Sequence, residues 1–395
     1  MSLADDMKLR MPLCIVASVL AALACGAAAA DRVGVVLPRQ VPAWLSSLSL
    51  QQRAAGALAA GRTREALASS AEAIVADPAS VAPIALLGGV QVALSRPAEA
   101  LQAFTVSAAR GWRDPATQFY WLAVALQVRD DLVAAQRLDA LLRTGTDLKE
   151  ITPVMAQMEA TPGRRAALAQ RIALNPQWAV EATAAIADLH GPALRRRVAL
   201  LTRARAAGYR PNCAWMRAPT SIIFDRGDFA DAAAAWHGLC GSGARVPLLV
   251  DGGFKQAAIG RDRVPFDWIF FPSGEAEVQL VASVGTPRGP GHILSVRSGE
   301  GSRQNIAAQD LVLAPGEYRL AMRAAPGLRV RIDCLVPGGD TPVQGAMLLS
   351  DATATRVFAV PRLGCAAQLL TLQVGIRNAT EPLWLDNMEI FRASG

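Results

Sequence analysis

Gly61-Arg62-Thr63-Arg64-Glu65-Ala66-Leu67 holds the phrase Glu-Ala-Leu, which returns 34 residues later at Glu99-Ala100-Leu101. A fainter copy follows after the same interval at Val133-Ala134-Ala135. A period of 34 residues indicates stacked helical hairpins, because one hairpin cannot bury its apolar face alone. The N-terminal half of the chain is therefore predicted to be an α-solenoid, which offers binding surface rather than reactive groups.

Small residues recur where neighbouring helices of such an array must approach closely, and a proline follows where the second helix of the first hairpin should end. The predicted packing positions are Ala54, Ala66, Ala73, Pro78, Gly88, Ala100, Ala134 and Ala232. On these residues the region from about Leu48 to Cys240 resembles the tetratricopeptide repeat family, in about six helical pairs. The resemblance implies a concave groove that holds a peptide or a partner protein. The alternative is that the array only spaces or supports the following domain.

The composition suits a folded chain of two domains. The 395 residues are 52% hydrophobic and 18% charged, enough apolar material to bury a core and too long for one domain of usual size. After Gly241 the apolar pattern changes from the helical period to strict alternation. We therefore expect a helical repeat domain over residues 47–241, a linker over 242–245 and a second domain over 246–395.

The first 30 residues read as a cleaved signal peptide. Met7-Lys8-Leu9-Arg10 gives a positive start, the apolar run Leu13–Leu23 is too short to span a membrane, and Ala28-Ala29-Ala30 suits cleavage before Asp31. Residues 31–46 then form an N-terminal segment. The expected location is periplasmic or secreted, and the protein is not expected to be an integral membrane protein. A lipid anchor on Cys25 is the alternative.

Export changes how the cysteines are interpreted. Four remain after cleavage, and four allow three pairings in an oxidising compartment. The near-neighbour pairing keeps each bond within one domain: Cys213 with Cys240, and Cys334 with Cys365. Four buried free thiols are the alternative, whereas the spacing is poor for zinc.

The second domain alternates polar and apolar residues. Ala276–Val281, Tyr318–Arg323, Leu328–Asp333 and Leu370–Val374 each show a period of two, separated by Pro-Gly and Gly-Gly turns. About nine or ten such strands predict a two-sheet antiparallel β-sandwich.

Three phrases in this domain resemble jelly-roll carbohydrate-binding modules. They are Leu249-Val250-Asp251-Gly252-Gly253-Phe254, the turn within Gln309–Tyr318, and the closing run Leu383–Ile390. The resemblance implies a jelly roll that binds polysaccharide through aromatic faces, and the candidates are Trp268, Phe271, Tyr318 and Trp384; each could equally fill the core. It also implies a structural calcium ion with Asp386 as a ligand. Lys255 stands where that family places an acidic ligand, so an ion pair between Lys255 and Asp386 is the alternative, and no other cofactor is expected.

The net charge of +7 could indicate an anionic partner, or only an arginine-rich surface. Nucleic acid is disfavoured because the chain is exported. No catalytic motif stands out: the three histidines lie away from any nucleophile phrase, and a glycosidase would need paired carboxylates.

The sequence therefore predicts a non-enzymatic, exported binding or scaffold protein. Its helical repeats recruit a protein partner while its sandwich contacts glycan, in the synthesis or export of a cell-surface polysaccharide. One alternative is a pure interaction scaffold in which the sandwich is a structural cap. The other is a polysaccharide-modifying enzyme with a hidden carboxylate pair.

Overall fold

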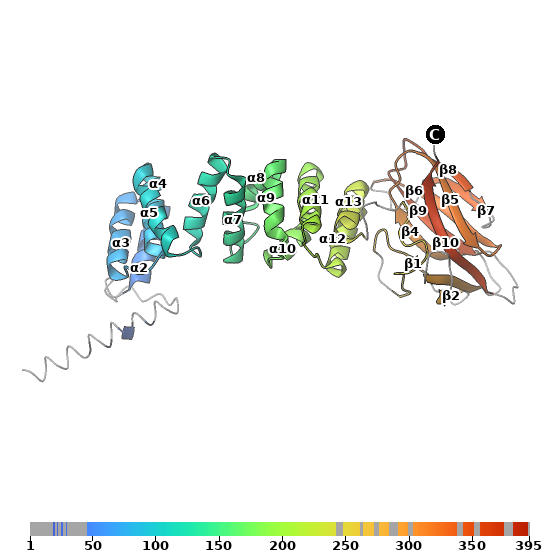
Figure 1. Ribbon diagram of the computed structural model, residues 1–395, viewed down its shortest axis with the longest axis horizontal. Helices are drawn as coiled ribbons and strands as arrows, with labels where there is room; N and C mark the ends of the chain where they lie inside the picture. The colour runs from blue at the N-terminus through green and yellow to red at the C-terminus, as the bar shows by residue number, and fades with distance from the viewer. Residues whose placement is uncertain are drawn as a thin grey trace, which may run out of the picture. The chain divides into compact units, whose positions relative to one another are not determined.

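A computed structural model describes residues 46–241, 248–260, 264–271, 276–283, 291–298, 303–337, 343–350, 356–374 and 382–393, with residues 19, 22, 25, 26 and 29. The predicted linker, and the predicted signal peptide and N-terminal segment apart from residues 19, 22, 25, 26, 29 and 46, lie outside these ranges. The chain divides into two compact units, residues 1–152 and 153–395. Each unit is described below by itself (Figure 1).

The first unit is made of helices: α2 (Ser47–Ala59), α3 (Thr63–Ala76), α4 (Ala82–Ala93), α5 (Pro97–Arg110), α6 (Pro115–Gln127) and α7 (Asp131–Arg143). They pack as the consecutive pairs α2–α3, α4–α5 and α6–α7. Several helices begin with proline at the first position, where its missing N–H leaves no gap in the hydrogen bonding. Asp114 caps α6 by accepting a hydrogen bond of 2.7 Å from the backbone N–H of Thr117.

The small residues of this array are buried between helices. Ala54, Ala66, Ala73, Ala100 and Ala134 are fully buried. At Gly88 an added Cβ would lie 2.8 Å from the ring of Phe104, so only glycine lets α4 and α5 approach this closely. Helix α3 ends at Ala76, just before the exposed Pro78.

The second unit continues with helices α8 (Thr152–Ala160), α9 (Pro162–Ile172), α10 (Trp178–Ala184), α11 (Gly191–Ala206), α12 (Cys213–Asp225) and α13 (Phe229–Cys240), with the short 3₁₀ helix η2 (Ala185–Asp188) after α10. Helices α9, α11 and α13 lie side by side in one layer, and α10 packs beside α12 in the other. Ala232 is fully buried in α13. Glu159 and Arg197 form a buried ion pair between α8 and α11, and Arg197 also donates 3.1 Å to the carbonyl of Ala182.

The rest of the second unit is a β-sandwich. Its strands are β1 (Ile269–Phe270), β2 (Ala276–Ser283), β3 (Gly291–Ser298), β4 (Gln304–Leu311), β5 (Gly316–Ala324), β6 (Leu328–Leu335), β7 (Val343–Ser350), β8 (Arg356–Val360), β9 (Ala367–Val374) and β10 (Leu383–Arg392). Sheet A has the order β1-β4-β9-β6-β7 and sheet B the order β2-β3-β10-β5-β8. The paired strands are antiparallel, and alternate residues of both sheets meet in one apolar core. The predicted fold class, helical hairpins followed by an antiparallel sandwich, is confirmed.

Helices α12 and α13 pack against the sandwich through aromatic side chains. Phe266 lies 5.6 Å from the ring of Phe224 and 5.2 Å from that of His237. An added Cβ at Gly227, which has a φ of +91°, would lie 2.7 Å from Pro337 at the end of β6. The last hairpin and the sandwich therefore share a packed interface.

Two disulfides join Cys213 to Cys240 and Cys334 to Cys365. The first links the start of α12 to the end of α13, and the second links the end of β6 to the segment before β9. Both follow the near-neighbour pairing expected from the sequence, and disulfides are typical of proteins in oxidising compartments. Among the described helices, none combines the length and apolar character that crossing a membrane requires.

Candidate ligand-binding site

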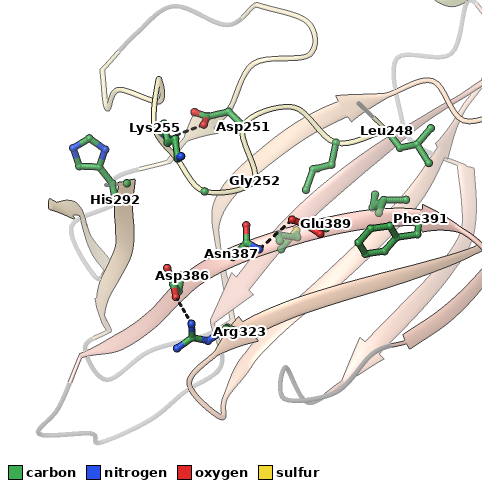
Figure 2. A pocket seen from close by; sticks show the side chains of 15 residues that line it. Leu248, Asp251, Gly252, Lys255, His292, Arg323, Asp386, Asn387, Glu389 and Phe391 are labelled. Atoms are coloured by element: carbon green, nitrogen blue, oxygen red, sulfur yellow. Dashed lines mark hydrogen bonds and ion pairs between the residues drawn. The ribbon is translucent and has the colours of Figure 1, made fainter. Parts of the chain in front are cut away.

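A pocket of about 580 Å³ lies over strand β10 of sheet B (Figure 2). Its walls come from the loop that precedes β1, from the start of β3 and from β5. The lining side chains that matter below are Leu248, Asp251, Lys255, His292, Arg323, Asp386, Asn387, Glu389 and Phe391. These residues are far apart in the sequence, and the sandwich brings them together.

The loop over the pocket is held by its own hydrogen bonds. The carboxylate of Asp251 accepts backbone N–H groups of Lys255 at 2.6 Å and Gln256 at 2.8 Å. Asp251 and Phe254 both adopt left-handed backbone conformations, with φ of 47° and 53°. The carboxylate satisfies the backbone of this tight turn, so the role of Asp251 is structural.

Gly252 joins the loop to the sheet. Its carbonyl accepts a 3.0 Å hydrogen bond from the backbone N–H of Met388 in β10. An added Cβ at Gly252 would lie only 1.8 Å from the carbonyl oxygen of Met388. The loop therefore lies on β10 almost like an extra strand, and only glycine permits this contact.

A β-bulge turns polar residues of β10 into the pocket. Leu385 pairs with Ala324 and Asn387 pairs with Arg323, so Asp386 is the extra residue on β10. Beyond the bulge, Met388 and Ile390 face the core, while Asn387, Glu389 and Phe391 lie on the outer face. The bulge thus places Asp386 and Asn387 next to one another.

The polar groups of the pocket include both donors and acceptors. Nη1 of Arg323 lies 3.0 Å from the carboxylate of Asp386, and the amide of Asn387 donates to Glu389 at 3.4 Å (Figure 2). Nδ1 of His292 lies 3.0 Å from the carbonyl of Phe254. Because a carbonyl only accepts, Nδ1 carries the proton and the neutral ring keeps a lone pair on Nε2.

An apolar patch adjoins these groups. Leu248 and Ile390 line the same pocket, and Phe391 lies there with 47% of its surface exposed. A hollow with an exposed aromatic ring beside mixed donors and acceptors suits a polyhydroxylated ligand, whose ring faces are apolar and whose hydroxyls both donate and accept.

The structure divides the four aromatic candidates into two groups. Trp268 and Tyr318 are core residues, which corrects their proposed role in stacking on sugar. Nε1 of Trp268 donates to the carbonyl of Asp251 at 2.9 Å, and Tyr318 stacks on Phe358 with its hydroxyl bonded to the carbonyl of Ala314. Their alternating strand positions point inward.

Phe271 and Trp384 are exposed, by 40% and 41%. Neither lines the pocket. Trp384 lies on the same strand as Phe391, seven residues earlier, which corresponds to about 20 Å along a strand. A ligand longer than the pocket could therefore reach it only by extending along β10.

Asp386, the candidate calcium ligand, lines the pocket and pairs with Arg323. The other polar residues, Arg323, His292, Asn387 and Glu389, were not predicted. Only the closing run Leu383–Ile390 drew attention to two of them, and nothing in the sequence indicated the bulge that turns them outward.

A second hollow of about 160 Å³ lies between α10 and α12. Its floor is Tyr209, whose hydroxyl is bonded to Thr183 at 2.9 Å and to the carbonyl of Ala179 at 3.2 Å. Burial raises the pKa of Tyr209, so this hydroxyl stays protonated. Trp215, with 64% of its surface exposed, stands at the rim.

Comparisons with known proteins give no family. No protein-family model matches the chain, and no curated protein matches it. Among solved structures, the chain is similar to a CBM4 carbohydrate-binding module, with 14% identity, a TM-score of 0.25, and coverage of 37% of this chain and 99% of that one. It is also similar to TmCBM61 in complex with β-1,4-galactotriose, with 12% identity, a TM-score of 0.23, and coverage of 38% and 100%.

A third similar structure is that of accessory secretory protein 1, 2 and 3 in Streptococcus pneumoniae. The identity is 12%, the TM-score is 0.23, and the match covers 29% of this chain and 86% of that one. Scores this low support no conclusion about function, so the function proposed below rests on the pocket itself.

Proposed function

We propose that this protein is an exported, non-catalytic binding protein whose sandwich holds a saccharide in the pocket over β10. Its helical hairpins would recruit a protein partner, and the natural setting is the synthesis or export of a cell-surface polysaccharide. The carrying observation is the pocket, in which fixed donors and acceptors surround an opening beside the exposed ring of Phe391.

The charges of the pocket favour an uncharged saccharide. Two cationic side chains, Lys255 and Arg323, and three carboxylates, Asp251, Asp386 and Glu389, line it. An acidic polysaccharide would meet an excess of carboxylates there, despite the positive charge of the whole chain. Binding at this site should therefore depend little on ionic strength.

The test is a glycan array probed with the full chain. Binding to a neutral saccharide is expected, and Asn387→Ala should reduce it at least tenfold, since one well-made polar contact contributes about 1.4 kcal/mol or more. Gln279→Ala is the matched control, because Gln279 is exposed on β2 of the same sheet and outside the pocket. No binding to any saccharide, or equal losses in both variants, would refute the proposed site.

The hollow between α10 and α12 supports the protein-binding part of the proposal. An exposed tryptophan beside a small pocket is typical of residues that dominate protein interfaces. Trp215→Ala should therefore abolish capture of a specific partner while leaving saccharide binding unchanged. Loss of both activities together would indicate a folding defect and refute this assignment.

A second candidate is a polysaccharide-modifying enzyme, because Asp251, Asp386 and Glu389 line one pocket. A glycosidase needs one carboxyl group that donates a proton. Here Asp251 accepts two backbone N–H groups and Asp386 lies 3.0 Å from a guanidinium, so both are arranged as acceptors. New reducing ends released from a bound saccharide, and lost in Glu389→Gln, would favour the enzyme over the binding protein.

A further inference from the structure

The carboxylate of Asp386 is nearly removed from solvent, although it lies on the outer side of sheet B. Its side chain is 8% exposed. Burying an ionised carboxylate is costly unless a counter-charge or several hydrogen bonds compensate for the lost water. Something in the pocket must supply that compensation.

Strand β5 supplies it. Nη1 of Arg323 lies 3.0 Å from Oδ2 of Asp386, within the range of a charge-assisted hydrogen bond (Figure 2). The bulge sets this geometry, since Arg323 is paired in register with Asn387 and the extra residue Asp386 is pushed next to it. The pairing is therefore determined by backbone register as well as by charge.

A calcium ion, the counter-charge that jelly-roll carbohydrate-binding modules imply at this aspartate, does not fit the side chains present. Calcium takes six to eight oxygen ligands. Both carboxylate oxygens of Asp251 already accept backbone N–H groups, and the guanidinium of Arg323 lies against Asp386. Within the described ranges, no three acidic, histidine or cysteine side chains are grouped to hold a metal ion.

We propose that Arg323 takes the place of a metal ion as the permanent counter-charge of Asp386, so that the sandwich reaches full stability without divalent cations. The strand that would flank an ion site carries the positive charge itself. The proposal is independent of the saccharide function, because it concerns the folded state of the pocket wall with or without a ligand.

Thermal unfolding of the full chain tests it, in EDTA and in millimolar CaCl₂. The unmodified protein should unfold at the same temperature in both, within about 1 °C. Arg323→Gln should lower the midpoint by roughly 3–10 °C in EDTA, since a buried carboxylate loses its partner. Arg319→Gln is the matched control: Arg319 is exposed on the same face of β5, four residues earlier, and should unfold like the unmodified protein.

A double variant separates charge from packing. Asp386→Asn combined with Arg323→Gln removes both charges and should recover most of the midpoint lost in Arg323→Gln, or restore folding if that variant does not fold. A double variant as unstable as Arg323→Gln would overturn the proposal. Stoichiometric calcium binding by the unmodified protein in isothermal titration, or a midpoint several degrees higher in CaCl₂, would also overturn it.

Discussion

Replacing Gly252 by alanine should separate the loop from β10. The added Cβ would lie 1.8 Å from the carbonyl oxygen of Met388, and an ordinary contact begins near 3.4 Å, so the two backbones must part by roughly 1.5 Å. That movement breaks the 3.0 Å hydrogen bond from Met388 to Gly252. A lost hydrogen bond with a donor left unsatisfied in a buried place costs about 2–4 kcal/mol. For a unit of this size, the midpoint should fall by roughly 5–15 °C.

The matched control is the adjacent glycine. A Cβ at Gly253 would meet nothing closer than the side-chain oxygen of Asn387 at 3.9 Å, so Gly253→Ala should change stability by no more than about 0.5 kcal/mol. Differential scanning calorimetry of the two variants gives the comparison, and saccharide binding should weaken only in Gly252→Ala. Equal midpoints in the two variants would refute the contact between loop and strand on which the pocket depends.

Further predictions concern the packed interface and the helices. Burial lowers the pKa of His237 to about 4, below its usual 6.5, so the fold excludes the charged form; stability should fall by about 3 kcal/mol as the pH drops from about 7 to 4, and His237→Gln should flatten this part of a urea-denaturation profile. A steeper profile in the variant would contradict the burial of His237. Arg197→Met leaves the carboxylate of Glu159 buried without its partner and should cost about 3–5 kcal/mol, whereas pairing it with Glu159→Leu should recover most of that loss in chemical denaturation; equal instability of the two variants would show that the pair acts through packing. Reduction of the Cys213–Cys240 disulfide should destabilise the protein by about 3–4 kcal/mol, and mass spectrometry after alkylation without reductant should find both residues unlabelled in the native protein; labelling of either would refute the bond.

The architecture was predictable because local patterns determine it. A helical hairpin is read from a repeat of 34 residues, and the buried small residues Ala54, Ala66 and Ala100 follow from that repeat. The strands follow from alternation. The sequence also favoured the disulfide pairing that the structure shows, because near-neighbour cysteines keep each bond within one domain.

The pocket was not predictable to the same degree, because it depends on contacts between distant segments. Residues 248–255 meet β10 more than 130 residues later, and no local pattern encodes that contact. Alternation also misled at Trp268, whose indole turns inward to bond the carbonyl of Asp251. The bulge at Asp386 breaks the alternation that a sequence reading assumes.

Isothermal titration of the full chain with the best neutral saccharide from the array is the most direct test of saccharide binding over β10. The account predicts one binding site, little change in affinity between low and high salt, and at least a tenfold weaker dissociation constant in Asn387→Ala but not in Gln279→Ala. An affinity that Asn387→Ala leaves unchanged, or that collapses with added salt, would contradict it.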